Sequence, residues 1–195
     1  MSSTLYKIMC RLIVFSLSWI TVLAVGLVGV TVQAQEVGEI DREKATKAAY
    51  LYNFGRYVQW PAESTAQAQN PFVIGVLEAD PIVEVLEEVA KRKKIHGRPI
   101  VIKHFASIAE YTPCQILFIA STVDPAERKA AIHKFQKSAV LLVGEDPGFA
   151  RQGGMFNFSV NDNRIHIEIN LDISKEAGLE ISSKLLSLAK VVATR

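Results

Sequence analysis

Apolar residues beyond position 70 gather in short, nearly continuous runs. Such runs, when turn residues bound them, are typical of strands buried on both faces of a sheet. The runs are FVIGVLE (72–78), IVIKHF (100–105), QILFIAS (115–121) and VLLVGE (140–145). We therefore expect four strands in the middle of the chain, and QILFIAS is the most apolar of them.

Helical patterns accompany these runs. The segment REKATKAAYLYNFGRYVQW (42–60) carries alanines and tyrosines near helical spacing, and the proline that follows gives it a stop. Asp80-Pro81 and Asp124-Pro125 each combine a capping carboxylate with proline at the first helical position, so we expect a helix to begin at each pair. Strands that alternate with helices indicate an α/β layer with a largely parallel sheet.

The pattern changes to a period of two in MFNFSVNDNRIHIEINLD (155–172). Apolar and polar residues alternate on both sides of the turn-forming stretch 161–164, which is typical of an antiparallel hairpin with one solvated face. Beyond Gly178, Ser182 can cap a final helix. The residues expected to form the buried stripe of that helix are Leu185, Leu186, Leu188, Ala189 and Val192.

The N-terminal segment has a different composition from the rest. Lys7 and Arg11 precede a long apolar run that ends in the motif VQA at Ala34. A basic start, an apolar centre and small residues at the end predict a signal peptide, residues 1–34, that is cleaved after Ala34. An uncleaved membrane anchor is the alternative, because about 20 apolar residues can span a bilayer. In both cases we expect residues 35–195 to form a single exported domain in the periplasm.

Removal of the signal peptide changes the charge balance and the cysteine content. The chain has 22 basic and 20 acidic residues, and two of the basic residues lie in the signal peptide, so the mature domain is formally neutral. The run KRKK (91–94) is best explained as the solvated end of a helix. No basic stripe remains for nucleic acid, and we expect no nucleic-acid partner. Cys114 becomes the only cysteine, which excludes an intramolecular disulfide, and its place before an apolar run predicts a buried thiol.

No catalytic or metal-binding motif is present in the sequence. The histidines form no H-E-x-x-H motif, although strand positions could bring His104 and His166 together. No G-x-S-x-G motif occurs. Asp80 and Asp124 follow apolar strands, where α/β folds often place functional groups, but helix capping explains both. We expect no enzyme activity, no cofactor and no metal. A hydrolase that depends on Cys114 or His104 is the alternative.

Two adjacent glycines follow Arg151 in EDPGFARQGGMFNF. A phosphate-binding loop places its glycines between a strand and a helix, whose first amides bind the anion. Gly153 and Gly154 instead precede a predicted strand. We therefore interpret them as a turn into the hairpin, in which glycine supplies a backbone conformation closed to other residues.

Several stretches taken together resemble one protein family. KAAYLYNFGRYVQWP, CQILFIAS, VLLVGEDPGFARQGGMFNF, RIHIEINLD and ISSKLLSLAKVV are similar, in this order, to segments of the YfiR family of small periplasmic proteins. The resemblance runs from about residue 43 to 192. It implies a three-layer α/β sandwich, with a mixed sheet, a C-terminal antiparallel hairpin and helices on both faces. Cys114 stands where the best-known member has a cysteine, but that member's stabilising cysteine pair in the C-terminal half is absent.

The resemblance also implies a regulatory role in the periplasm. The best-known member inhibits an inner-membrane diguanylate cyclase through the periplasmic sensor region of that enzyme, and an OmpA-like outer-membrane lipoprotein relieves the inhibition. The output is the cyclic di-GMP level, and with it attachment, biofilm formation and motility. We expect partners of the same kind for this protein. The sequence leaves open whether the protein also forms a homodimer.

The residues expected to contact a partner are Tyr57, Trp60, Phe149 and Arg151. Buried packing would explain the aromatic members of this set equally well. The alternative function is a periplasmic small-ligand sensor or carrier, in which Arg151 receives an anion, since strand ends of a parallel sheet form clefts.

Overall fold

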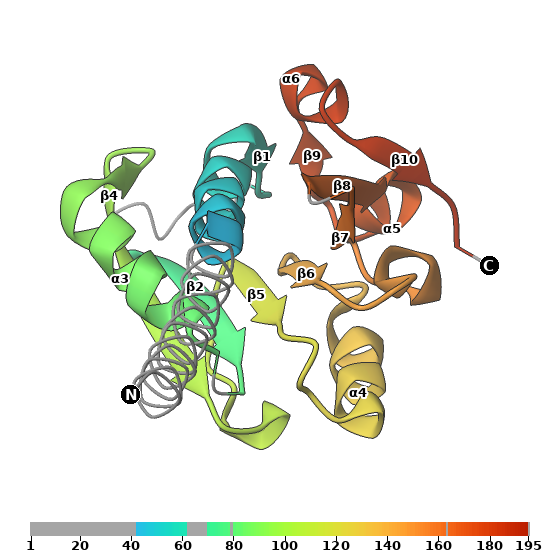
Figure 1. The fold of residues 1–195 in the computed structure, drawn as a ribbon, viewed down its shortest axis with the longest axis horizontal. Coiled ribbons are helices and arrows are strands. Elements are labelled where there is room, and N and C mark those ends of the chain that lie inside the picture. Colours follow the sequence, from blue (N-terminus) through green and yellow to red (C-terminus); the bar gives the residue numbers. More distant parts are fainter. Residues whose placement is uncertain (1–41, 62–69, 79, 163, 195) are drawn as a thin grey trace, which may run out of the picture. The chain divides into compact units, whose positions relative to one another are not determined.

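The described part of the chain is one compact unit. This unit begins at Glu43. The expected signal peptide and its cleavage site lie outside the described residues. No helix in the described part of the chain is both long and apolar enough to cross a bilayer. The computed structural model describes residues 42–61, 70–78, 80–162 and 164–194 (Figure 1).

A mixed sheet forms the centre of the unit. Its strands are β2 (Phe72–Leu77), β3 (Lys94–Ile95), β4 (Arg98–Phe105), β5 (Ile116–Ile119), β6 (Leu141–Gly144), β7 (Phe156–Asn161), β8 (Arg164–Asn170) and β10 (Lys190–Val192). Within the described residues the strand order is β10-β8-β7-β6-β5-β2-β4-β3. The five strands from β7 to β4 in this order run parallel, whereas β8 and β10 at one edge and β3 at the other run antiparallel to them. The four strands predicted from the apolar runs are confirmed as β2, β4, β5 and β6.

Helices cover both faces of this sheet. α3 (Ile82–Arg92) connects β2 to β4, and α4 (Pro125–Phe135) connects β5 to β6. These two connections step in opposite directions along the sheet, because β4 and β6 lie on opposite sides of the β2-β5 pair. Connections between parallel strands are right-handed, so helices with opposite steps lie on opposite faces. The expected three-layer α/β sandwich is therefore confirmed (Figure 1).

The helix formed by residues 42–57 lies on the opposite side of β5 from α4 (Figure 1). It ends at Tyr57 and not at Trp60, so the predicted boundary was wrong. Val58 and Gln59 instead form a short strand, β1 (Val58–Gln59), that runs antiparallel to β9 (Glu180–Ile181). Helical periodicity in a sequence cannot reveal pairing with a segment so far along the chain, and this pairing overrides the local pattern.

The predicted cap at Asp124 is confirmed, whereas the N-cap position of α3 is taken by Pro81 and Asp80 lies one residue before it. Asp124 accepts a hydrogen bond from the backbone N–H of Ala126 at 2.8 Å, at the start of α4. Asp80 accepts one from the N–H of Ile82 at 2.7 Å, at the start of α3. Each bond satisfies one of the free N–H groups of a first helical turn.

The predicted hairpin is confirmed as β7 and β8, whose last paired residues are Asn161 and Arg164. The prediction that its polar face is solvated was wrong for the inner half of the hairpin. Asn157 is 1% exposed and Asn170 is fully buried. The side-chain amide of Asn170 donates to the carbonyl of Ala150, so the turn that precedes β7 packs over this face. A period of two fixes which residues share a face but not what covers that face.

The predicted final helix was wrong for most of its length. Ser182 does cap a helix, since its hydroxyl accepts from the N–H of Leu185 at 3.4 Å, but α6 (Ser183–Leu186) is a single turn. The chain then enters β10, which runs parallel to β8. Val192 is therefore buried in the sheet, whereas Leu188 is 68% exposed. Before α6, α5 (Leu171–Glu176) ends near Gly178.

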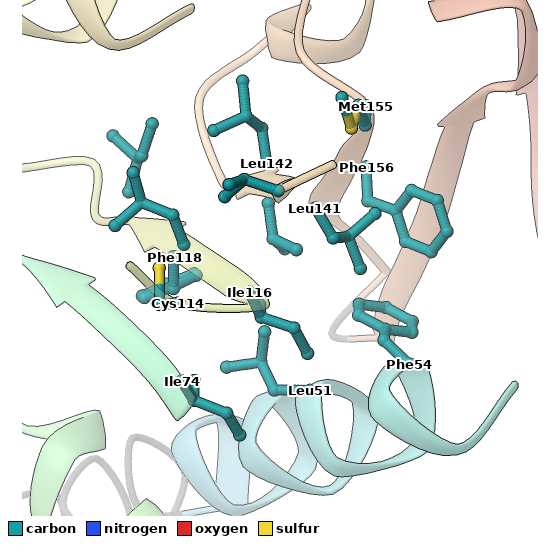
Figure 2. Close-up of a cluster of buried hydrophobic side chains, with 14 of the residues drawn as sticks. Leu51, Phe54, Ile74, Cys114, Ile116, Phe118, Leu141, Leu142, Met155 and Phe156 are labelled. Carbon is teal, nitrogen blue, oxygen red and sulfur yellow. The ribbon is translucent and has the colours of Figure 1, made fainter. Parts of the chain in front are cut away.

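One part of the core lies between the 42–57 helix and the sheet. Leu51 and Phe54 point from the helix toward strand residues such as Ile74 and Ile116, and all of these side chains are buried (Figure 2). The ring of Phe54 lies edge-on to that of Phe156, with centroids 4.8 Å apart. Full burial of such a side chain stabilises the fold by roughly 1.5–3 kcal/mol, so this interface holds the helix in place.

Candidate functional site

The turn before β7 contains the two adjacent glycines. Residues Phe149–Gln152 form a 3-10 helix, η2, which ends at Gly153 with a φ of 105°. Glycine adopts this conformation readily and other residues rarely do. A Cβ atom at Gly154 would overlap the ring of Phe149, so this position excludes a side chain for a steric reason. The interpretation of the glycines as a turn into the hairpin is confirmed.

Two of the predicted contact residues lie in this turn, and they differ in exposure. Phe149 is fully buried, with its ring packed against the backbone of Gly144 and Gly154. The side chain of Arg151 is 28% exposed, and its guanidinium lies 3.7 Å from the carboxylate of Glu168 on β8. Phe149 therefore offers no surface to a partner in this structure. Arg151 lies beside a carboxylate, which would repel an incoming anion.

The other two predicted contact residues lie at the end of the 42–57 helix. Trp60 is half-buried and packs edge-on against Phe72, with ring centroids 5.3 Å apart. Tyr57 is also half-buried, and two cations lie near its ring. The guanidinium carbon of Arg56 is 5.4 Å from the ring centroid, and the ammonium of Lys184 is 5.2 Å from it. Packing against Phe72 accounts for the position of the Trp60 side chain. That any of the four residues binds a partner remains a prediction.

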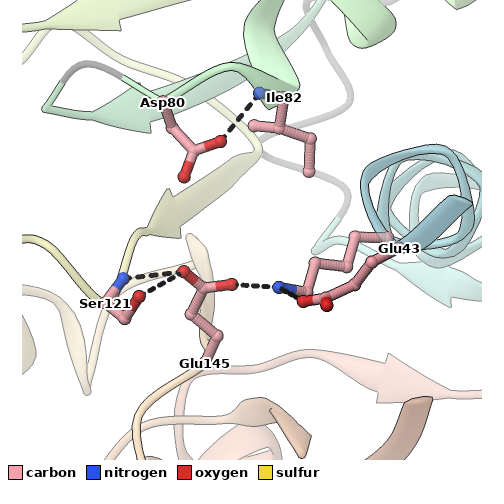
Figure 3. Close-up of polar contacts among 6 residues, drawn as sticks. Glu43, Asp80, Ile82, Ser121 and Glu145 are labelled. Carbon is pink, nitrogen blue, oxygen red and sulfur yellow. Dashed lines mark hydrogen bonds and ion pairs between the residues drawn. The ribbon is translucent and has the colours of Figure 1, made fainter. Parts of the chain in front are cut away.

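A polar cluster lies at the carboxyl ends of β5 and β6, an edge where α/β sheets often bind ligands. Glu145 follows β6 and accepts hydrogen bonds from both the N–H and the hydroxyl of Ser121, each at 2.8 Å (Figure 3). Its other carboxylate oxygen accepts from the ammonium of Lys47 at 2.5 Å, and Lys47 also pairs with Glu43. The cluster therefore connects the 42–57 helix to the ends of two strands.

Burial and pairing have opposite effects on the pKa values in this cluster. Burial raises the pKa of Glu145, but the bonds and charge of Lys47 and the bonds from Ser121 outweigh it, and the pKa falls below its usual 4.5. Burial lowers the pKa of Lys47, but Glu145 and Glu43 together raise it above its usual 10.5. Both groups stay charged at neutral pH. Neither has the pKa near 7 that a general acid or base needs, so the cluster is suited to a structural role.

Other charged groups at this edge also make internal contacts. Asp80 and Asp124 accept hydrogen bonds at the starts of helices, as described above. Arg128 of α4 forms an ion pair with Asp146 at 2.8 Å, although the two atoms do not have hydrogen-bond geometry. Within the described residues, each of these carboxylates therefore has an internal contact that explains its position without catalysis.

Cys114 and the histidines form no reactive group in the described structure. Cys114 is buried, as predicted, and burial raises the pKa of its thiol to about 12, so the reactive thiolate is scarce at neutral pH. His104 lies on β4 and His166 on β8, and these strands are far apart in the sheet order. The part of the chain that the structure describes contains no group of three or more His, Cys, Asp or Glu side chains that could hold a metal ion.

The described fold, from the 42–57 helix to β10, corresponds to one known family. A family model described as YfiR/HmsC-like matches residues 44–190, well over half of the chain. The chain belongs to the YfiR/HmsC-like family. The match begins in the 42–57 helix and ends at the first residue of β10, so it includes the glycine turn, Tyr57 and all of the polar cluster except Glu43. The resemblance seen in the sequence is therefore confirmed.

Membership in the YfiR/HmsC-like family supports a general role for this chain. The family consists of periplasmic regulators of cyclic di-GMP signalling, which act on a membrane diguanylate cyclase and are not catalysts. The sequence alone did not reveal the pairing of Lys47 with Glu145 or the place of Lys184 beside Tyr57. Each contact joins residues far apart in the chain, and neither has a local motif that could have indicated it.

Proposed function

We propose that this protein inhibits an inner-membrane diguanylate cyclase by binding the periplasmic sensor region of that enzyme. The observation that carries the proposal is the YfiR/HmsC-like match over residues 44–190. The signal-peptide pattern of residues 1–34 supports export to the compartment in which such a sensor region lies. An inhibited cyclase makes less cyclic di-GMP, so the protein restrains attachment and biofilm formation.

The internal contacts of the polar groups also support a binding role over catalysis. The charged residues at the carboxyl ends of β5 and β6 pair with one another or cap helices. Cys114 is buried and has a raised pKa. The side chains that a hydrolase would use as nucleophile, acid or base are therefore either buried or engaged in contacts that stabilise the fold.

Relief of the inhibition requires a second partner in this proposal. An OmpA-like outer-membrane lipoprotein that sequesters the inhibitor would free the cyclase. Tyr57, Trp60 and Arg151 are the predicted contact residues that retain exposed surface. A small-ligand carrier receives less support, because Glu168 lies 3.7 Å from the guanidinium expected to receive an anion.

Deletion and reconstitution test the proposal. Deletion of the gene is expected to raise cyclic di-GMP and biofilm, and expression of the full chain is expected to restore both. The protein purified from the periplasm is then mixed with membranes that contain the cyclase. Unchanged cyclic di-GMP after deletion, together with no retention of the cyclase on the purified protein, would refute inhibition. Heat on titration with nucleotides or amino acids would instead favour the small-ligand sensor.

A further inference from the structure

Two cations and a tyrosine form one surface at the end of the 42–57 helix. Arg56 and Lys184 are exposed, and their charged groups lie 5.4 Å and 5.2 Å from the centroid of the Tyr57 ring. Arg56 also lies 5.6 Å from the centroid of the Tyr52 ring. Contact with aromatic rings holds long basic side chains in preferred positions, so the two charges are arranged before any partner arrives.

Segments far apart in the chain build this surface. β1 pairs with β9, and the carbonyl of Tyr57 accepts a hydrogen bond from the N–H of Ser182 at 3.0 Å. This bond places the start of α6, and with it Lys184, beside the helix end. Leu188 follows in the next turn of the chain and is 68% exposed. We name Arg56, Tyr57 and Lys184 the cation–tyrosine surface.

The charges of this surface are not neutralised within the described residues. Neither Arg56 nor Lys184 forms an ion pair there, whereas Lys47, Arg128 and Arg151 each pair with a carboxylate. Glu180 on β9 is close in the chain but lies outside ion-pair distance of both cations. The domain without residues 1–34 is formally neutral, so these two charges are not part of a general basic excess.

The composition of the surface fits an acidic protein segment better than a membrane. Recognition of anionic lipid headgroups usually uses clusters of four to eight basic residues, and this surface has two. Two fixed cations beside a tyrosine, with an exposed leucine nearby, suit a short segment that offers carboxylates and an apolar side chain.

We infer that the cation–tyrosine surface binds an acidic segment in the periplasmic region of the regulated membrane protein. This inference rests on the proposed function, because it names the surface and the charge of the partner for that same interaction. The attraction between exposed charges weakens as salt increases, so the interaction is sensitive to ionic strength.

The test uses the protein purified from the periplasm and a double charge reversal, Arg56→Glu with Lys184→Glu. The matched control is Lys134→Glu, since Lys134 is an exposed cation that lies 5.4 Å from the Tyr111 ring centroid, on a different part of the chain. Each protein is titrated with an oligo-glutamate peptide while amide NMR signals are followed. Each is also titrated with phosphatidylglycerol vesicles, and tested for inhibition of the cyclase in membranes. Circular dichroism checks that the wild type and both variants fold.

We expect the wild type to bind oligo-glutamate with shifts at Tyr57 and Lys184. The double reversal is expected to weaken peptide binding and cyclase inhibition by about tenfold or more, because each reversal turns an attraction into a repulsion. Lys134→Glu is expected to behave as the wild type. Equal inhibition by the wild type and the double reversal would overturn the inference, as would binding of vesicles without binding of peptide. A wild type that binds the peptide but never inhibits or retains the cyclase would refute the proposed function instead.

Discussion

The contact of Glu145 with Lys47 and Ser121 gives the clearest quantitative prediction. Replacement of Glu145 by alanine removes two hydrogen bonds from Ser121 and one ion pair with Lys47. The two charged side chains are only 10% and 13% exposed, so water cannot easily replace what is lost. We expect Glu145→Ala to destabilise the fold strongly for a single polar substitution.

The size of this effect follows from the environment of the pair. Removal of one partner from a buried ion pair costs about 3–5 kcal/mol, and each lost hydrogen bond about 1 kcal/mol. Lys47 keeps Glu43 as a second partner, which reduces the first of these costs. We therefore expect a loss of about 3 kcal/mol for Glu145→Ala, or a fall in Tm of roughly 6–12 °C for a domain of this size. Glu145→Gln keeps an oxygen for Ser121, so its expected cost is smaller, about 1–2 kcal/mol.

Urea unfolding followed by circular dichroism measures these differences, and a double-mutant cycle with Lys47→Met isolates the pair. Glu88→Gln is the control, because its ion pair with Lys91 is exposed and its removal should leave stability unchanged.

The pKa of Glu145 is lowered in the folded protein, so the stabilisation that its carboxylate provides is present above pH 4.5 and is lost as the pH falls through the folded pKa. The stability difference between wild type and Glu145→Gln should therefore vanish in acid. Equal stability at pH 7, or a difference that persists at pH 2, would refute this reasoning.

Two further predictions concern the glycine turn and the buried thiol. Gly154→Ala should destabilise the fold by about 2 kcal/mol, because its Cβ overlaps the ring of Phe149; an unchanged thermal midpoint would contradict this. Cys114 should not react with a thiol reagent at pH 8 until the protein is unfolded, since its pKa is raised to about 12; rapid labelling of the native protein would contradict this.

The sequence predicted the parallel part of the sheet well because its signals are local. Apolar runs such as QILFIAS are buried on both faces, and their short length between turn residues favours a strand over a helix. The start of α4 also had a local cause, since Asp124 lies two residues from the N–H group that it caps. Physical causes that act within a few residues are visible in a sequence.

The C-terminal segment was predicted poorly because its structure depends on distant pairing. Leu185, Leu188 and Val192 have helical spacing, and a helix was a reasonable interpretation. The structure instead uses the Val191-Val192 pair to extend the sheet beside β8, where β-branched residues pack well. Leu188 is exposed in this arrangement. An available sheet edge cannot be inferred from the residues that join it.

The candidate site was predicted only in part for the same reason. Tyr57 and Trp60 were chosen because they are the aromatic residues at the end of a predicted helix, and both retain some exposure. Phe149 was chosen because it lies in the loop just before the two glycines, but Gly144 and Gly154 leave room for its ring in the core. Lys184 could not be chosen, because only the pairing of β1 with β9 brings it near Tyr57.

Asn170 shows how one polar residue can fix several segments at once. Its side-chain amide donates to the carbonyl of Ala150 and to the hydroxyl of Thr194, while its side-chain oxygen accepts from the N–H of Ile173. Its backbone N–H donates to the carbonyl of Met155. The residue is fully buried, and these bonds replace the contacts with water that its amide loses on folding. The glycine turn, the start of α5 and the segment after β10 therefore share one hydrogen-bonded centre. A substitution that displaces any one of these segments is expected to disturb the other two, because all three bond to the same side chain.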